Sequence, residues 1–189
     1  MDVFLQKFID NKKYILIAII TVFIAGILYG FYQYNHSSHM VKVFFENLFH
    51  LNLENYENKY QFYLIQNLFL IFICTYLSSS YLGHIGILFL TFLKGIQLSF
   101  SIIHIYITVS LSFITIILLF IEILIEIVLC IVLSLYHIHI SIYVTLITFY
   151  IEQNFNIKSM LNYRLNNLIA SLIIFIISLA FRLYIIPMF

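Results

Sequence analysis

Three ionisable side chains lie inside long apolar runs of the sequence, where a charge is costly to bury. They are Lys94 and, further along the chain, Glu122 and Glu126. A charge at the centre of a lipid bilayer costs on the order of 3 kcal/mol on insertion scales, so such residues are usually paired or line a path. This pattern indicates either a proton or ion relay or a polar contact for a partner helix.

The spacing of the same residues also fits a structural ion pair. If Ser110 is the centre of a turn between two antiparallel helices, Lys94 lies sixteen residues before it and Glu126 sixteen residues after it. Those two side chains then share one depth, and Glu122 lies one turn away, about 6 Å along the axis, on the same face as Glu126. A Lys94–Glu126 pair would fix the register of the hairpin. Glu122 would still need a partner, a proton or water, and both interpretations stay open.

Catalytic motifs are absent from the sequence. It has no glycine-rich nucleotide-binding loop, no G-x-S-x-G and no H-E-x-x-H. The only aspartates, Asp2 and Asp10, precede the first apolar run, and Cys74 and Cys130 lie in separate apolar runs, as buried inert thiols do. We therefore expect no enzymatic activity, no metal and no cofactor. The net charge of +1 also provides no field to recruit nucleic acid.

The composition places these residues in a membrane. Of 189 residues, 63% are hydrophobic and only 9% are charged, against about 25% charged in an ordinary soluble domain. A water-soluble fold of this size could not cover so much apolar surface. We expect an all-α integral membrane protein with a single transmembrane domain. Since roughly 20 apolar residues cross the hydrocarbon layer, the predicted spans are 14–34, 62–80, 85–109, 111–135 and 168–186.

The positions of Lys and Arg predict the orientation. Three lysines precede the first span, and Lys158 and Arg164 precede the last. Basic segments stay in the cytoplasm, so the N-terminus is expected inside, loop 35–61 outside and segment 136–167 at the cytoplasmic interface. This arrangement has five spans. The alternative is six spans, in which the short apolar run 138–151 also crosses and both termini are inside.

The outer loop contains one amphipathic stripe. Its apolar residues follow the spacing of one helical face: Val41, Phe44, Phe45, Leu48 and Phe49. The stripe is either a surface for the membrane or an extracytoplasmic partner, or a face that rests on the other transmembrane helices.

The first span also carries a GxxxG motif, formed by Gly26 and Gly30. Small residues at this spacing let a second helix approach closely. The approaching helix can belong to the same chain or to a second copy in a homo-oligomer.

The stretch from 67 to 100 resembles the stage II sporulation protein M family and its wider relatives. Those proteins carry an Asn near the start of one helix, a Gly-containing turn, and a helix with a Lys-Gly pair followed by a small residue and Phe. The matching positions here are Asn67, Gly83 or Gly86, Lys94, Gly95, Ser99 and Phe100. Further on, family members often carry a Pro-His-Gly or Pro-Gln-Asn element, some with a Glu shortly after it. Here Phe120, Ile121 and Glu122 stand in place of that element, and Glu126 is kept. At the end of the chain, Tyr184 and Pro187 match the family's terminal Glu-x-Tyr-x-x-Pro, with Arg182 in place of Glu.

The resemblance implies a non-enzymatic subunit that scaffolds a complex in the bacterial plasma membrane. Sporulation members recruit peptidoglycan-remodelling proteins from the outer side of the membrane. Other relatives accompany ABC-transporter genes, including clusters for bacteriocin export or immunity. The expected partners are the lipid bilayer and either wall-remodelling proteins or ABC-transporter subunits. The alternative functions are a component of peptide export or immunity, and a small secondary transporter using Lys94, Glu122 and Glu126.

Overall fold

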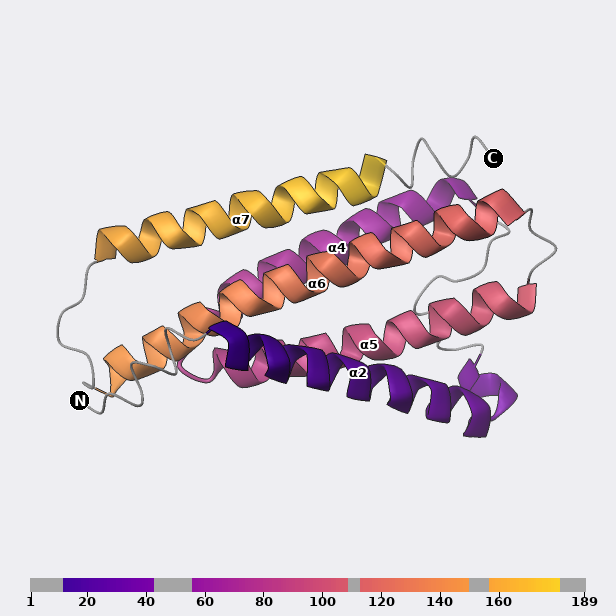
Figure 1. Ribbon diagram of the computed structural model, residues 1–189, viewed down its shortest axis with the longest axis horizontal. Coiled ribbons are helices and arrows are strands. Elements are labelled where there is room, and N and C mark those ends of the chain that lie inside the picture. The colour runs from indigo at the N-terminus through magenta and orange to yellow at the C-terminus, as the bar shows by residue number, and fades with distance from the viewer. Residues whose placement is uncertain (1–11, 43–55, 109–112, 150–156, 181–189) are drawn as a thin grey trace.

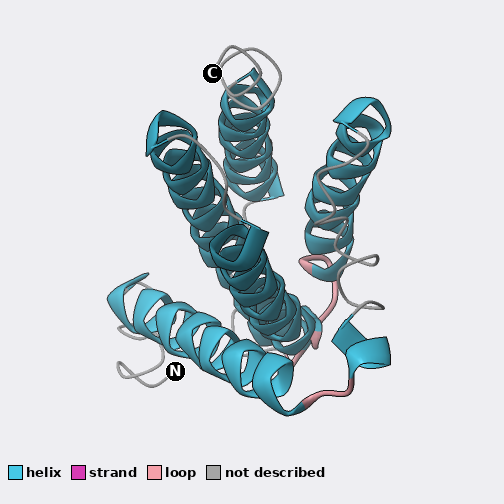
Figure 2. Ribbon diagram, turned by 90° about the vertical axis from the view of Figure 1, so that its right-hand side faces the viewer, coloured by secondary structure: helices cyan, strands magenta, loops and turns pink. Residues whose placement is uncertain are grey.

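A computed structural model describes residues 12–42, 56–108, 113–149 and 157–180 of the chain. Within these ranges the regular structure is helical, and the view coloured by secondary structure contains no strand there (Figure 2). The helices are α2 (Lys12–His36), α4 (Tyr56–Leu77), α5 (Gly83–Thr108), α6 (Phe113–Thr148) and α7 (Ile157–Ala180). The expected all-α fold is confirmed for this part of the chain.

The five helices form one elongated bundle (Figure 1). Following the colour along the chain, α2, α5 and α7 run in one direction, while α4 and α6 run in the other (Figure 1). The start of α2 and the end of α7 therefore lie at opposite ends of the bundle. Helix α6 is its centre, because it contacts each of the other four helices.

Three helices are long and apolar enough to cross a membrane. The qualifying stretches are Lys13–His36 in α2, Gly83–Ile103 in α5 and Phe120–Thr148 in α6. Helices α4 and α7 contain shorter apolar stretches, Asn67–Leu77 and Leu168–Ile177. Large apolar side chains such as Phe72 and Ile176 point outward, 70% and 59% exposed. A bundle with such an exterior fits lipid better than water.

Helix α6 differs from the sequence prediction. The prediction ended a span at residue 135 and treated 138–151 as a separate segment, whereas the structure has one helix through to Thr148. No Gly or Pro interrupts the sequence at that point, and the buried face continues across it through Leu129, Leu133, His137 and Ser141 at a spacing of four. At 1.5 Å per residue this helix is about 54 Å long, longer than the hydrocarbon layer of about 30 Å.

Helices α4 and α7 begin earlier than the predicted spans. The prediction placed their starts at residues 62 and 168, and the structure places them at Tyr56 and Ile157. The extra turns are polar but contain no Gly or Pro, so they continue the helix beyond the apolar stretch. Hydropathy identifies only the apolar stretch of each helix, and in α4 and α7 this stretch is shorter than the whole helix.

The GxxxG motif of α2 packs against α5 of the same chain. A Cβ atom added to Gly26 would collide with the backbone carbonyl of Phe92, and one on Gly30 would come within 2.8 Å of Ser99. On the α5 side, a Cβ on Gly95 would lie 2.5 Å from the Phe23 carbonyl oxygen. Small residues four apart on both helices thus bring the two backbones into contact.

A hydrogen bond crosses the same contact. The hydroxyl of Ser99 donates to the carbonyl oxygen of Ile27 at 2.7 Å. This Ser is fully buried, and its hydroxyl also lies 3.1 Å from the Gly95 carbonyl oxygen of its own helix. The bond ties α5 to α2 without a long side chain, which keeps the interface narrow.

The tight turn between α4 and α5 is held by α6. Gly83 begins α5 so close to the last carbonyl of α4, that of Leu77, that a side chain would not fit. From α6, the Ser141 hydroxyl accepts a hydrogen bond from the His84 backbone N–H at 2.7 Å and donates to the Ser80 carbonyl at 2.9 Å. These bonds satisfy backbone groups that the helix ends leave unpaired.

Gly95→Ala is expected to destabilise the fold, because its methyl group meets backbone that cannot move aside. Overpacking of this kind costs about 1–3 kcal/mol, more than the gain in helix propensity. The matched control is Gly86→Ala on the same helix, where the methyl group meets only the flexible end of Leu77 at 3.0 Å. Thermal unfolding of the two purified variants in detergent should show a lower midpoint for Gly95→Ala alone; equal midpoints would contradict the close contact.

Candidate functional site

Lys94 and Glu126 form an ion pair between α5 and α6. The ammonium Nζ lies 3.5 Å from Oε2 of Glu126, and the two side chains are 8% and 16% exposed. The pair predicted from the sequence spacing is thus present in the structure. Because both charges are mostly withdrawn from solvent, each offsets much of the desolvation cost of the other.

Polar side chains define the register between α5 and α6. They lie near the end of the bundle that holds the turn between α4 and α5. The hydroxyls of Thr91 and Ser134 lie 2.8 Å apart in the buried contact between the helices, and the Ser141 bond to His84 lies two turns away. In both contacts the two residues are equally far along the sequence from the midpoint between residues 112 and 113, and not from Ser110 as assumed from the sequence. In this register the backbones of Lys94 and Glu126 are offset along the helix axes by more than one turn, and the long lysine side chain bridges the offset.

Glu122 is the third member of the predicted cluster. It is buried, 5% exposed, one turn from Glu126 on α6. The neighbouring core contains Phe23, Leu98 and Cys130. Two carboxyl groups and one ammonium therefore lie in apolar surroundings, an arrangement that can fix helices together or hold a proton.

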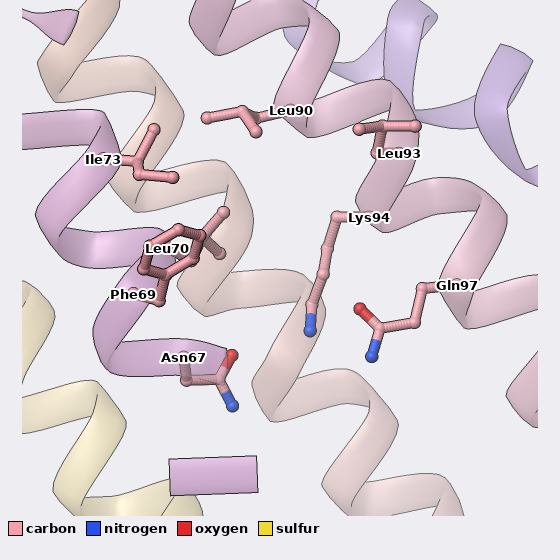
Figure 3. A pocket seen from close by; sticks show the side chains of 8 residues that line it. All are labelled: Asn67, Phe69, Leu70, Ile73, Leu90, Leu93, Lys94 and Gln97. Atoms are coloured by element: carbon pink, nitrogen blue, oxygen red, sulfur yellow. The ribbon is translucent and has the colours of Figure 1, made fainter. Parts of the chain in front are cut away.

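A cavity between α4 and α5 reaches the ion pair. Its volume is about 200 Å³, and it is lined by Asn67, Phe69, Leu70, Ile73, Leu90, Leu93, Lys94 and Gln97. The Lys94 ammonium and the two amide side chains point into the same space (Figure 3). The cavity is therefore mainly apolar, with a polar end at the charged pair.

Asn67 contributes the most unusual group of this cavity. It is fully buried, and neither its amide nitrogen nor its amide oxygen has a hydrogen-bond partner in the ranges that the structure describes. Most buried polar groups in proteins are hydrogen-bonded, so such a side chain requires an explanation. Sequence reasoning singled it out only through the family resemblance. An Asn in an otherwise apolar run was the signal available.

The other positions on which the family resemblance rests make different kinds of contact in the structure. Gly95 and Ser99 pack on α2, Gly83 forms the turn after α4, and Gly86 lies against Leu77. Sequence reasoning treated Gly95 and Ser99 as family positions and missed that they oppose the GxxxG motif, although their spacing of four was the signal. Tyr184 and Pro187 lie outside the described residues.

The amphipathic stripe predicted from the sequence is described only at its beginning. Val41 lies in a short helical segment, residues 39–42, while the other members, Phe44, Phe45, Leu48 and Phe49, lie outside the described residues. This segment is anchored to the bundle, because the Lys42 ammonium lies 4.7 Å from the ring centroid of Tyr34, and that ring makes an edge contact with Phe100 at 5.3 Å.

The other groups capable of chemistry are the two cysteines and the possible metal ligands. Cys74 and Cys130 are buried free thiols. Across the described ranges, no three His, Cys, Asp or Glu side chains gather closely enough to hold a metal ion.

Comparison with known proteins gives no relative. A scan against protein-family models, a search of curated proteins and a search of solved structures each found no match for this chain. Its function must therefore be argued from the features above.

Neutralising one member of the ion pair is expected to destabilise the fold more than neutralising both. Lys94→Met or Glu126→Gln alone leaves a buried charge, which costs about 3 kcal/mol or more, whereas the double variant Lys94→Met/Glu126→Met removes both charges. Folding yield and unfolding midpoint in detergent measure this, and Lys13→Met, at the exposed start of α2, is the control. Normal yields for both single variants would show that the pair does not support the fold.

Proposed function

We propose that this chain is a non-enzymatic subunit that scaffolds a complex in the bacterial plasma membrane, as the stage II sporulation protein M family does. The proposed topology has five spans, with the N-terminus in the cytoplasm and the C-terminus outside. The alternating directions of the five helices support this topology, because they put the start of α2 and the end of α7 at opposite ends. The partner would be a wall-remodelling protein.

The observation that carries this proposal is the anchored start of the outer segment. The Lys42 ammonium lies over the Tyr34 ring, and this ring makes an edge contact with Phe100, so residues 39–42 are fixed to the end of α2 and to α5. Next to this anchor Met40 is 85% exposed, and the predicted stripe follows at once. A partner surface attached to a closely packed pair of helices is held in a defined place, as a scaffold requires.

A second candidate function is transport or immunity, either with an ABC ATPase or as a small secondary transporter. The observation that favours it is the cavity that ends at Lys94, because polar sites near the middle of a bundle are where transporters bind substrates. In this case Glu122 and Glu126 would exchange protons or ions, and substitution of either would abolish pH-dependent transport.

The test is photocrosslinking in native membranes with a photoreactive phenylalanine analogue in place of Phe45. The matched control is the same replacement at Phe72, which is 70% exposed on α4 and faces lipid in the proposed topology. We expect position 45, but not position 72, to capture a membrane-anchored or extracytoplasmic wall-remodelling protein.

Two other results would contradict the scaffold proposal. Capture of ABC-transporter subunits at position 45 would favour the second candidate function. Capture of the chain itself, or equal capture at both positions, would show that the stripe is a packing surface rather than a docking site for a wall-remodelling protein.

A further inference from the structure

The polar end of the cavity contains a donor and an acceptor that have no partner among the described residues. The amide of Asn67 is fully buried and aimed into the cavity, without a partner in the described part of the chain (Figure 3). Lys94 adds an ammonium with three N–H donors, of which the contact to Glu126 occupies one. A molecule that pairs with Asn67 would recover the cost of burying these groups.

The cavity opens sideways from the bundle. Two of its lining side chains, Phe69 and Leu93, are 61% and 41% exposed on the outer surface of α4 and α5. In the membrane placement proposed above, this surface faces the acyl chains of the bilayer. The molecule that enters is therefore one that partitions into lipid and carries a polar group at one end.

The chemistry of the polar end restricts that group. A protonated amine offers donors only and is repelled by Lys94, and an ester or ketone offers acceptors only, which leaves the Asn67 Oδ1 unpaired. A fixed anion pairs with Lys94, but it must also lie near Glu126, the carboxylate that already neutralises that lysine. The group that remains is neutral and both donates and accepts.

A protonated carboxyl group meets these requirements, because its donor and its acceptor lie side by side along one edge of a planar group. Its O–H donates to Oδ1 of Asn67, its carbonyl oxygen accepts from Nδ2, and the second lone pair of that oxygen can accept from Lys94. The low dielectric of the site favours the neutral form of the acid. The volume also fits, since about 200 Å³ exceeds the cavity of roughly 150 Å³ that accommodates benzene in an engineered protein core.

We propose that this cavity binds the neutral carboxyl end of a long-chain fatty acid, which enters from the bilayer between α4 and α5. The first part of the acyl chain lies among Leu70, Ile73 and Leu90, and the remainder leaves past Phe69 and Leu93. This inference rests on the proposed membrane placement but not on the scaffold role, because the site needs no partner protein.

The test uses the purified full chain in phosphatidylcholine nanodiscs and a photoactivatable palmitic acid. We expect saturable labelling of peptides from α4 and α5, competed by palmitic acid and at least about tenfold less by methyl palmitate, which lacks the O–H donor. Asn67→Leu should reduce labelling about tenfold. The control, Thr21→Val, removes an exposed hydroxyl that bonds to its own helix on α2 and should label normally.

A second measurement separates binding from folding. Asn67→Leu removes two buried polar atoms without partners in the described chain, so its unfolding midpoint without fatty acid should not fall. Palmitic acid should raise the midpoint of the parent chain but not that of Asn67→Leu. Equal labelling of both proteins, equal competition by methyl palmitate, or no saturable labelling would overturn the proposal. None of these results depends on what crosslinks at Phe45, so the two proposals fail separately.

Discussion

The antiparallel alignment of α5 and α6, defined by the Thr91–Ser134 contact, is the constraint on which the rest of the bundle depends, and the Lys94–Glu126 ion pair forms across the same two helices. In lipid there is no water to satisfy a misplaced polar group, so each polar contact across the two helices restricts their relative position. The Thr91–Ser134 contact and the Ser141 bonds at the turn agree on the same alignment. Helix α6 then serves as the support for the bundle, because it contacts α2, α4, α5 and α7.

Helix α5 distributes its contacts by face, which links packing to both proposed functions. Gly95 and Ser99 meet α2, where small side chains allow close approach of the two backbones. Thr91 faces α6, while Leu93 and Gln97 line the cavity toward α4. The side that packs closely on α2 carries the anchored start of the predicted amphipathic stripe, and the opposite side carries the cavity. A partner site and a lipid site can therefore coexist without competing for the same residues.

The sequence predicted those features that follow from hydropathy and spacing. The all-helical fold, with helices apolar enough to cross a membrane, follows from long apolar runs. The Lys94–Glu126 pair follows from the rarity of charges in those runs and from their spacing. What it missed depends mainly on neighbours that are distant in the sequence. The spacing of four between Gly95 and Ser99 is a local signal for close helix packing, but it does not say that these residues oppose Gly26 and Gly30. The continuity of α6 past residue 135 and the cavity at Asn67 depend on burial against other helices. Tertiary contacts decided these features, and hydropathy does not encode them.

The alignment of α5 and α6 is tested most directly by a disulfide within native membranes. In a chain with Cys74 and Cys130 replaced by Ala, Thr91→Cys and Ser134→Cys place two thiols where the hydroxyls lie 2.8 Å apart. The structure predicts rapid intramolecular disulfide formation on mild oxidation, and none when Thr91→Cys is combined with Val128→Cys, which is 50% exposed on the outer surface of α6. Failure of the first pair to crosslink, or crosslinking of the second instead, would contradict the alignment of α5 and α6 across which the ion pair forms.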